Sequence, residues 1–354
     1  MSEGKCVLYG SYGYTGDLIA RFARERGMDL VLAGRDEARL KEQAAQRGHA
    51  YRVADLSDAA RMREILSDAT LAIHCAGPFG ATYRPIAEAC IDTGTHYIDV
   101  CGDVDVLNGL ASLDGRARAA GVMLTPGVAF AIMSTNVMAL HLKERLPEAT
   151  HLALAFHNRG GVVSRGTAGT ALTNLHRGAV VRRDGELVPV PMGSIRRAID
   201  YGDGDVSPSA VVRFGDVVTA WHATGIANIE VYTAMPGAAA RVLSTLQPLL
   251  PLIQKPFIAK RIQRRIARRP LGPSDAQRDA AHIRVWGEAR DARGNVVTSR
   301  LRIPDGYSLT MRATLDAAGR ILRGEAKPGF QAPASAFGSD ALLGLEGVGV
   351  FEDA

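Results

Sequence analysis

The sequence lacks the features of several protein classes. Its four cysteines, Cys6, Cys75, Cys90 and Cys101, form no CxxC pair, and no basic-plus-apolar leader stands before the first predicted strand. We therefore expect a reduced, cytoplasmic protein. The nine histidines show no close spacing such as HExxH, so no metal is expected. No uncharged run approaches the roughly 20 residues that cross a bilayer.

No internal repeat, low-complexity segment or extreme of charge is present either. The net charge of +5 is mildly basic and is not by itself a nucleic-acid signature, so no nucleic-acid partner is expected. Hydrophobic residues make up 47% and charged residues 22%, as in an ordinary soluble protein. A chain of 354 residues suggests two domains, at roughly 150 residues each.

Residues 1–131 alternate between short apolar runs and amphipathic stretches. "KCVLYG" (5–10) and "DLVLAG" (29–34) are typical of buried strands, and "YTGDLIARFARERG" (14–27) of a helix. Strands that alternate with helices of this length pair in parallel through right-handed crossovers. The pattern predicts an α/β fold, a Rossmann-type doubly wound parallel sheet, over residues 1–131.

Residues 132–306 follow a different pattern, in which turn residues separate runs of strand-forming residues. Segments such as "AVVRRDGELVPV" and "AHIRVWGEARDARGNVVTSRLRI" indicate hairpins. We predict a second α+β domain with a mainly antiparallel sheet, which serves the substrate and dimerisation. Exposed sheet edges are compatible with a homodimer. A helix begins at about residue 307, and the segment 307–354 is expected to pack back on the first domain.

The first glycine-rich turn is a candidate dinucleotide site. Gly10, Gly13 and Gly16 lie between a predicted strand and a predicted helix, where glycines permit a tight turn, close approach of a pyrophosphate and close helix packing. The N-terminus of the helix would present N–H groups to the phosphates. A purely structural turn is the alternative. The predicted contacts are Gly10, Ser11, Tyr12, Gly13, Tyr14, Thr15 and Gly16.

The end of the second predicted strand indicates which cofactor binds. NAD sites usually carry an acid there, but "LAGRD" places Gly34 near that position, followed by Arg35. A small residue and a guanidinium suit a 2′-phosphate, so NADP(H) is favoured, with Ser11 as a further hydroxyl contact. Alternatively, Arg35 is a solvated residue at the start of a helix that Asp36 caps.

Two more strand ends complete the predicted cofactor site. Asp55 ends the third strand and borders the adenine, or else caps the next helix. The fourth strand ends in "CAGPF", at the sheet edge where ligands bind in such folds. We expect this edge to run beside the nicotinamide ribose through Ala76, Gly77, Pro78 and Phe79.

The ordered motifs resemble those of the saccharopine dehydrogenase-like oxidoreductases, a family that includes trans-acting enoyl reductases and saccharopine reductase. They are "YGSYGYTG", "LAGRD", "AGPF", "EACIDTGTHYIDVCGD", "GDVVTAWHATGIANIEVY", "GPSDAQR" and "KPGFQAPASAFG". The resemblance implies a Rossmann domain, an α/β domain with an antiparallel sheet, NADP(H), and hydride transfer to C=N or conjugated C=C bonds. Ala129 stands where family members often carry an acid, which disfavours true saccharopine reduction and favours enoyl-type reduction.

Several side chains are candidates for the chemistry. None of the nine tyrosines has a lysine four residues later, which excludes the Tyr-x-x-x-Lys scheme of short-chain dehydrogenases. The resemblance to the family implies a tyrosine shortly after "AGPF", and Tyr83 occupies this position. Its phenol is expected to donate to a substrate carbonyl; alternatively, Tyr83 packs the start of a helix. Asp99, Cys101 and Asp103 end one strand and are expected to line the nicotinamide pocket, although Cys101 also suits a buried position.

The second domain offers candidate substrate contacts. Ser164, Arg165 and Thr167 precede a helix and could bind an anionic group, or Thr167 could simply cap the helix. Trp221 and His222 are predicted on a strand, either closing over the substrate, with His222 catalytic, or packing in the core. The substrate is a small molecule or a carrier-bound one.

An unusually basic segment spans residues 255–269. No acid occurs between Glu230 and Asp275, and isoleucines form a stripe beside the basic face. The segment predicts an interfacial helix that contacts anionic lipid, which would make the protein peripheral to a membrane, or an acidic carrier protein. Alternatively, the segment is a solvated helix over the second domain. For the whole protein, the alternative to an enzyme is a non-catalytic protein that binds the cofactor. The face comprises Lys260, Arg264 and Arg268 beside Ile258, Ile262 and Ile266.

Overall fold

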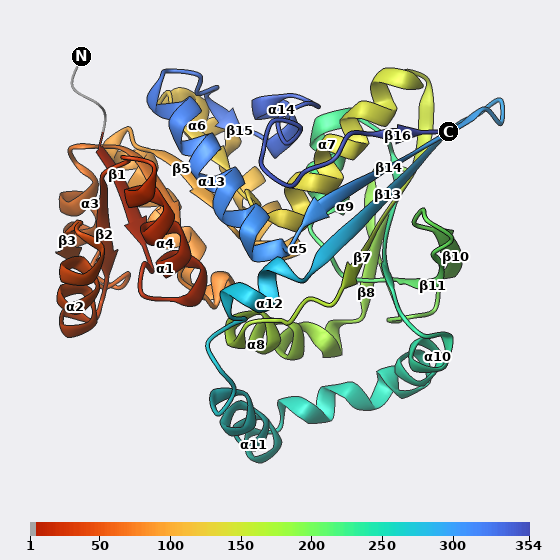
Figure 1. Cartoon of the computed structure of the whole chain (residues 1–354), viewed down its shortest axis with the longest axis horizontal. Coiled ribbons are helices and arrows are strands. Elements are labelled where there is room, and N and C mark those ends of the chain that lie inside the picture. Colours follow the sequence, from red (N-terminus) through yellow and green to blue (C-terminus); the bar gives the residue numbers. More distant parts are fainter. Residues whose placement is uncertain (1–4) are drawn as a thin grey trace. The chain divides into compact units, whose positions relative to one another are not determined.

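The computed structural model describes residues 5–354, apart from the side chains of residues 173, 254 and 256. The chain forms two compact units. Unit 1 comprises Met1–Met133 and Tyr307–Phe337, and unit 2 comprises Ser134–Gly306 and Gly338–Ala354 (Figure 1). The expectation that all of 307–354 packs on the first domain is wrong for its last part. Residues 338–354 belong to unit 2, because the end of the chain pairs with a strand of its sheet.

Unit 1 is built on a seven-stranded sheet in the order β15-β6-β5-β4-β1-β2-β3, with every neighbouring pair parallel. The order reverses at β1, which lies between β2 and β4. This confirms the predicted doubly wound sheet, whose ligand crevice lies at the carboxyl ends of the strands beside that reversal. The strands are β1 Lys5–Tyr9, β2 Leu30–Gly34, β3 Ala50–Val53, β4 Ala69–His74, β5 His96–Asp99, β6 Met123–Thr125 and β15 Gly329–Phe330.

Helices connect the strands of unit 1. Apolar residues of β1 and β2 are buried because helices cover the parallel sheet; Val7, Leu8 and Leu32 are completely inaccessible. Burial also raises the pKa of the Cys6 thiol to about 12, so this cysteine behaves as a small apolar core residue. The helices are α1 Tyr14–Glu25, α2 Glu37–Arg47, α3 Ala59–Leu66, α4 Phe79–Thr93, α5 Val104–Ala111, α6 Asp114–Ala119, α13 Gly306–Leu322 and α14 Pro333–Phe337.

Unit 2 contains a nine-stranded mixed sheet with the main order β10-β11-β12-β7-β13-β14-β16, and β8 and β9 attached beside β12. All its pairs are antiparallel except β12 with β7, which confirms the mainly antiparallel sheet. The strands are β7 Ala149–Arg159, β8 Ala179–Arg183, β9 Glu186–Val190, β10 Arg196–Asp200, β11 Val206–Val211, β12 Asn228–Ala234, β13 His282–Asp291, β14 Val296–Pro304 and β16 Glu352–Asp353.

One predicted strand of unit 2 is a helix. Residues of "DVVTAWHATG" form α9, Asp216–Thr224, which ends where Gly225 adopts a left-handed conformation with φ 70°. The valines and threonines of this segment favour a strand, which is why a strand was predicted. Burial of this helix outweighs that preference. The other elements of this unit are α8 Arg165–Asn174, η1 Leu175–Arg177, α10 Gly237–Leu246, η2 Gln247–Gln254, α11 Pro256–Ala267 and α12 Asp275–Asp279; α7 is Phe130–Arg145.

A buried carboxyl group joins α9 to α7 inside unit 2. Asp216 is completely buried and its Oδ1 accepts a hydrogen bond from the Thr135 hydroxyl. Asn136 lies beside it and donates to Thr219 over 2.9 Å. Within the described part of the chain, Oδ2 of Asp216 and Oδ1 of Asn136 have no hydrogen-bond partner. Burial raises the pKa of Asp216 to about 7.

This carboxyl group should make stability depend on pH. The folded protein binds the Asp216 proton more tightly than the unfolded chain, so between about pH 4 and 7 the folded state holds more protons. The contribution of Asp216 to stability is therefore present at low pH and is lost as the pH rises through this window. Asp216→Asn should flatten the urea-unfolding midpoint against pH and stabilise the protein by about 1–3 kcal/mol above pH 7.

Asp340→Asn, which alters an exposed carboxyl group, is the matched control. Urea unfolding is followed at several pH values for both variants. Destabilisation of Asp216→Asn above pH 7 would show that the ionised carboxylate itself is required.

Candidate cofactor-binding site

The glycine loop passes from the end of β1 between two neighbouring strands. Gly10 has φ +81°, and its N–H donates to the carbonyl of Ala33 at 2.8 Å. A Cβ at Gly10 would lie 2.6 Å from the backbone nitrogen of Ala76, at the end of β4. Gly10 is therefore needed both for its left-handed backbone and for this close approach.

The next two glycines have different surroundings. A Cβ at Gly16 would lie 2.5 Å from the carbonyl oxygen of Gly10, so Gly16 lets α1 pack on the loop. A Cβ at Gly13 would meet nothing closer than that same oxygen at 3.3 Å. The space before Gly13 is thus open at the loop, where a pyrophosphate would approach.

The N-terminus of α1 is suited to an anion. Its N-cap, Gly13, offers no side-chain hydrogen bond to the first turn. Asp17 is acidic and lies in that turn, but its carboxylate pairs with Arg47 at 2.6 Å and accepts from Gln43 at 2.9 Å. No side chain therefore caps the positive end of the helix, and the charge of the acid in its first turn is already matched by an arginine.

A tyrosine and two arginines shape the end of β2. A Cβ at Gly34 would lie 2.6 Å from the ring of Tyr12, so a larger residue would displace that ring. The guanidinium of Arg39 lies over the same ring at 4.4 Å and donates to the Tyr12 carbonyl at 3.0 Å. Arg35 is exposed, and over residues 5–354 no acid pairs with it.

Arg39 was missed in the sequence analysis, although its position one helical turn after Arg35 was a usable signal. Asp36 caps α2 by accepting from the Arg39 N–H at 3.1 Å, as the alternative interpretation of this segment expected. Both features coexist: Asp36 starts the helix while Arg35 and Arg39 supply guanidinium groups at its first turn. Ser11 is completely buried, so its hydroxyl does not face the open side of the loop as predicted.

Asp55 shapes its own loop at the end of β3. Its Oδ1 accepts from the N–H of Ser57 at 2.9 Å and from the Ser57 hydroxyl at 2.7 Å, which lowers the pKa of Asp55. The alternative that Asp55 caps the next helix is wrong, because Asp58 is the N-cap of α3. Its contact with an adenine stays a prediction.

The loop after β4 is supported by hydrogen bonds that involve Thr82 and the buried His74. Thr82 donates to the carbonyl of Ala76 at 2.6 Å, and Nε2 of His74 lies 3.0 Å from the same hydroxyl. Burial lowers the pKa of His74 to about 3, so the ring is neutral. The predicted edge from Ala76 to Phe79 therefore rests on a hydrogen-bonded support that the sequence analysis missed. The peptide bond between Gly77 and Pro78 is cis.

Asp99 ties three backbone segments together at the end of β5. It accepts from the Tyr97 hydroxyl at 2.7 Å and from the N–H groups of Cys101 at 2.9 Å and Gly127 at 2.8 Å. It is completely buried, which raises its pKa to about 6. The geometry gives Asp99 a structural role instead of the predicted catalytic one.

Two further predicted catalytic residues also have packing roles. Cys101 is 2% exposed, and burial raises the pKa of its thiol well above the ordinary value. Asp103 caps α5. Tyr83 lies on α4 instead of in the edge loop, and a Cβ at Gly109 of α5 would lie 2.2 Å from its hydroxyl oxygen. Tyr83 thus lies in the first turns of α4 and contacts α5, which agrees with the alternative that it packs a helix start, while donation to a substrate carbonyl stays a prediction.

The residues of unit 2 that were predicted to bind the substrate contact neighbouring protein groups instead. Arg165 donates through Nε to the Arg269 carbonyl at 3.1 Å, and the Ser164 hydroxyl accepts from the Thr167 N–H at 3.2 Å as the cap of α8. Trp221 and His222 lie on α9, where the guanidinium of Arg182 lies 4.2 Å from the Trp221 ring.

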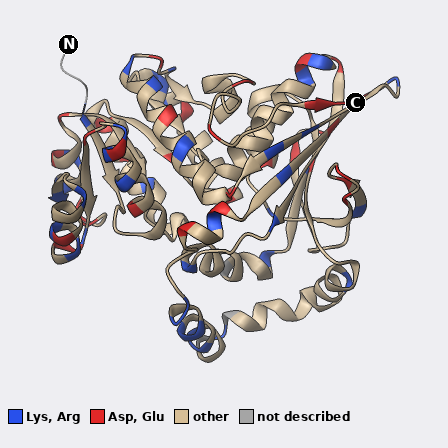
Figure 2. Cartoon of the chain, viewed as in Figure 1, with Lys and Arg blue, Asp and Glu red and all other residues tan. Residues whose placement is uncertain are grey.

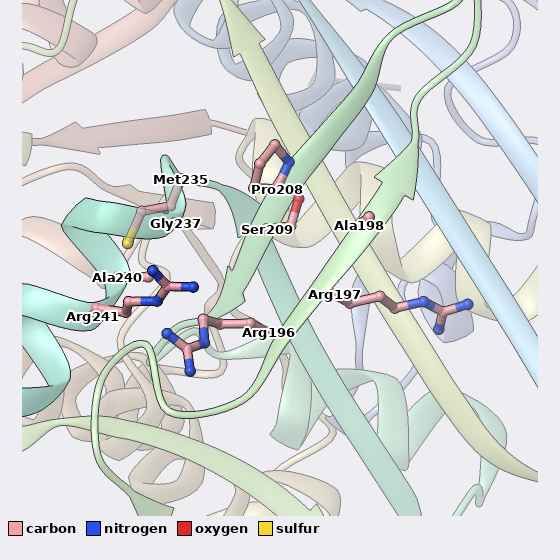
Figure 3. A pocket seen from close by; sticks show the side chains of 9 residues that line it. All are labelled: Arg196, Arg197, Ala198, Pro208, Ser209, Met235, Gly237, Ala240 and Arg241. Carbon is pink, nitrogen blue, oxygen red and sulfur yellow. The ribbon is translucent and has the colours of Figure 1, made fainter.

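Unit 2 also contains two surface cavities that the sequence did not indicate. One, of about 310 Å³, is lined by Arg196, Arg197 and Arg241 at the start of α10 (Figure 3). The other, of about 370 Å³, is lined by the ion pairs Arg183–Glu230 and Arg197–Glu288. Arg165, Thr167, Trp221 and His222 line neither cavity.

Comparison with known proteins gives this geometry a family context. Residues 6–125 match the family described as the saccharopine dehydrogenase NADP binding domain. The saccharopine dehydrogenase-like oxidoreductase of Rattus norvegicus is 32% identical over 120 residues, which cover 28% of each chain. The trans-acting enoyl reductase of Mycobacterium ulcerans is 27% identical over 154 residues, 41% of this chain and 37% of that one. The matches thus span about a third of these relatives' own length.

A solved structure resembles the whole chain. Apo saccharopine dehydrogenase (L-Glu forming) from Saccharomyces cerevisiae has a TM-score of 0.66 over 99% of both chains, at 14% identity, which is evidence for the fold alone.

The doubly wound sheet, the open glycine loop and the basic end of β2 together define a dinucleotide-binding protein. The loop and both arginines, Arg35 and Arg39, lie inside the segment that matches the NADP-binding family. The first domain is therefore an NADP-binding domain similar to that of the saccharopine dehydrogenase family.

Proposed function

We propose that the protein is an NADPH-dependent reductase that acts on an activated double bond, with a conjugated C=C bond as the first candidate. The observation that carries the proposal is the end of β2, where Gly34 replaces the usual acid and two guanidinium groups follow. This arrangement favours a 2′-phosphate over a free 2′-hydroxyl. NADPH supplies the hydride when it is bound.

The residues of unit 1 bind and orient the cofactor. The N-terminus of α1 would hold the pyrophosphate, and Arg35 with Arg39 would hold the 2′-phosphate. The edge from Ala76 to Phe79, supported by neutral His74, would border the nicotinamide ribose and orient the ring. Such positioning is the main contribution that a protein makes to hydride transfer.

Two considerations place C=C before C=N. Two relatives, each 27% identical, are named trans-acting enoyl reductases. Position 129 carries an alanine, whose side chain has no proton to transfer, where the resemblance to the family implies a carboxyl group. Imine reduction, which forms a secondary amine, is the alternative, and the fold match to saccharopine dehydrogenase supports it only at the level of fold.

The experiment follows deuterium from the cofactor. The protein is incubated with NADPH deuterated at C4 and either an enoyl thioester or an amine with a keto acid, and products are analysed by mass spectrometry. We expect deuterium in the saturated thioester. Deuterium in a secondary amine would instead establish the imine alternative.

Gly13→Val, which blocks the pyrophosphate position, is the control for background reduction. If labelled cofactor binds but no product from either substrate set carries deuterium, the reductase proposal is wrong for these bonds and a non-catalytic cofactor binder is favoured. Binding is measured separately by the fluorescence of NADPH.

A further inference from the structure

The segment 237–269, called the arm below, has an unusual composition within unit 2. It comprises α10, η2 and α11, which Figure 1 shows as a continuous run of helices below the sheet. The arm contacts β11 through α10 and contacts α8 through α11. At the C-terminal end of the arm, Arg165 donates a hydrogen bond to the carbonyl of Arg269. The arm is therefore attached at both ends.

The positive charge of the arm is uncompensated. No Asp or Glu occurs between Glu230 and Asp275, and Figure 2 shows basic residues gathered along the ribbon of α11. In the part of the chain that the structure describes, none of these cations forms an ion pair, whereas Arg47, Arg159 and Arg197 elsewhere do. The cations are Arg241, Lys255, Lys260, Arg261, Arg264, Arg265, Arg268 and Arg269.

Large apolar side chains project from the same segment. Five of the twelve large hydrophobic residues that are exposed among the described residues lie on the arm, and Phe257 is 78% exposed. Scattered exposure of this kind is ordinary, but its concentration beside unpaired cations is not. The five are Val242, Leu246, Leu249, Leu252 and Phe257.

The exposed apolar surface of the arm is not formed by the predicted stripe of isoleucines. Ile258, Ile262 and Ile266 are half-buried, and α11 contacts α8. The exposed apolar residues come instead from α10, η2 and the first turn of α11. The cavity at the start of α10 adds Arg196 and Arg241 and no acidic residue to this surface (Figure 3).

We propose that the arm binds the surface of an anionic lipid bilayer. Apolar side chains that project from a basic segment enter the boundary between headgroups and acyl chains while Lys and Arg contact anionic headgroups. An acidic carrier protein would match the charge but would leave Phe257 and the leucines without a comparable apolar phase. Among residues 5–354, no helix combines the length and apolarity needed to cross a bilayer, so the contact proposed is a surface one. The proposal does not depend on the reaction.

Vesicle flotation with the full chain tests the proposal. We expect binding to phosphatidylcholine vesicles that contain phosphatidylserine, little binding to phosphatidylcholine alone, and release by high salt. The triple variant Lys260→Glu, Arg264→Glu, Arg268→Glu should bind at least about tenfold more weakly. A second variant, Leu249→Ser, Leu252→Ser, Phe257→Ser, keeps the charge and should also lose about tenfold.

The matched control reverses three exposed cations outside the arm, Arg26, Lys41 and Arg293, and should retain binding. NADPH binding and circular dichroism verify that each variant is folded. Equal vesicle binding by the wild type and the arm variants, or no binding to anionic vesicles, would overturn the proposal. Retention on a purified acyl carrier protein without vesicle binding would identify an acidic protein as the partner instead.

Discussion

Gly13→Val is expected to abolish binding of both NADPH and NADH while the protein stays folded. The Gly13 backbone is extended, with φ −74° and ψ 166°, so any residue can adopt it. An added Cβ meets only the Gly10 oxygen at 3.3 Å, a tight contact, and otherwise points into the open space in front of the loop. That space is where the pyrophosphate must approach the helix, so a branched side chain excludes the cofactor and not the fold.

The measurement compares Kd by fluorescence titration with the thermal unfolding midpoint. Cofactor affinity should fall at least about a hundredfold, while stability changes by less than about 1 kcal/mol. Gly16→Val provides the contrast, because its Cβ would lie 2.5 Å from a backbone oxygen and should destabilise the domain. Gly115→Val, at a glycine with nothing within 4 Å, controls for valine itself. Undiminished cofactor affinity in Gly13→Val would place the pyrophosphate elsewhere.

The cofactor loop could be predicted from the sequence because its requirements are local. Gly10, Gly16 and Gly34 each occupy a position where the structure leaves no room for a Cβ, and the spacing of such glycines is visible along the chain. The ends of parallel strands also meet at one edge, so "LAGRD" and "CAGPF" could be placed beside the loop without coordinates.

The roles of individual side chains could not be predicted in the same way, because they depend on contacts between distant segments. Asp99 ends a strand like a catalytic residue, yet its partner at Gly127 is 28 residues away and the contact buries it. Tyr83 packs on Gly109, across the interval between two helices. In unit 2, β7 pairs with β13, more than a hundred residues later, so the cavity that these two strands line could not be predicted from local pattern.

The arginines after β2 give the second large expected effect. Arg35→Ala combined with Arg39→Ala should weaken NADPH binding by roughly a hundredfold, since charge-assisted hydrogen bonds to a phosphate contribute about 1.5–3 kcal/mol each before solvent screening. NADH lacks the 2′-phosphate, so its affinity should change by less than about threefold. Both Kd values are measured by fluorescence, at low and high salt.

The single variants separate two roles of Arg39. If its guanidinium only braces Tyr12 by lying over the ring and donating to the carbonyl, Arg39→Ala will weaken NADPH and NADH equally. If it also contacts the 2′-phosphate, the loss will fall on NADPH and will shrink as salt screens the phosphate. Equal loss of both cofactors in Arg35→Ala as well would refute the assignment of this strand end to the 2′-phosphate. Specificity for NADPH would then have to arise from another part of the domain.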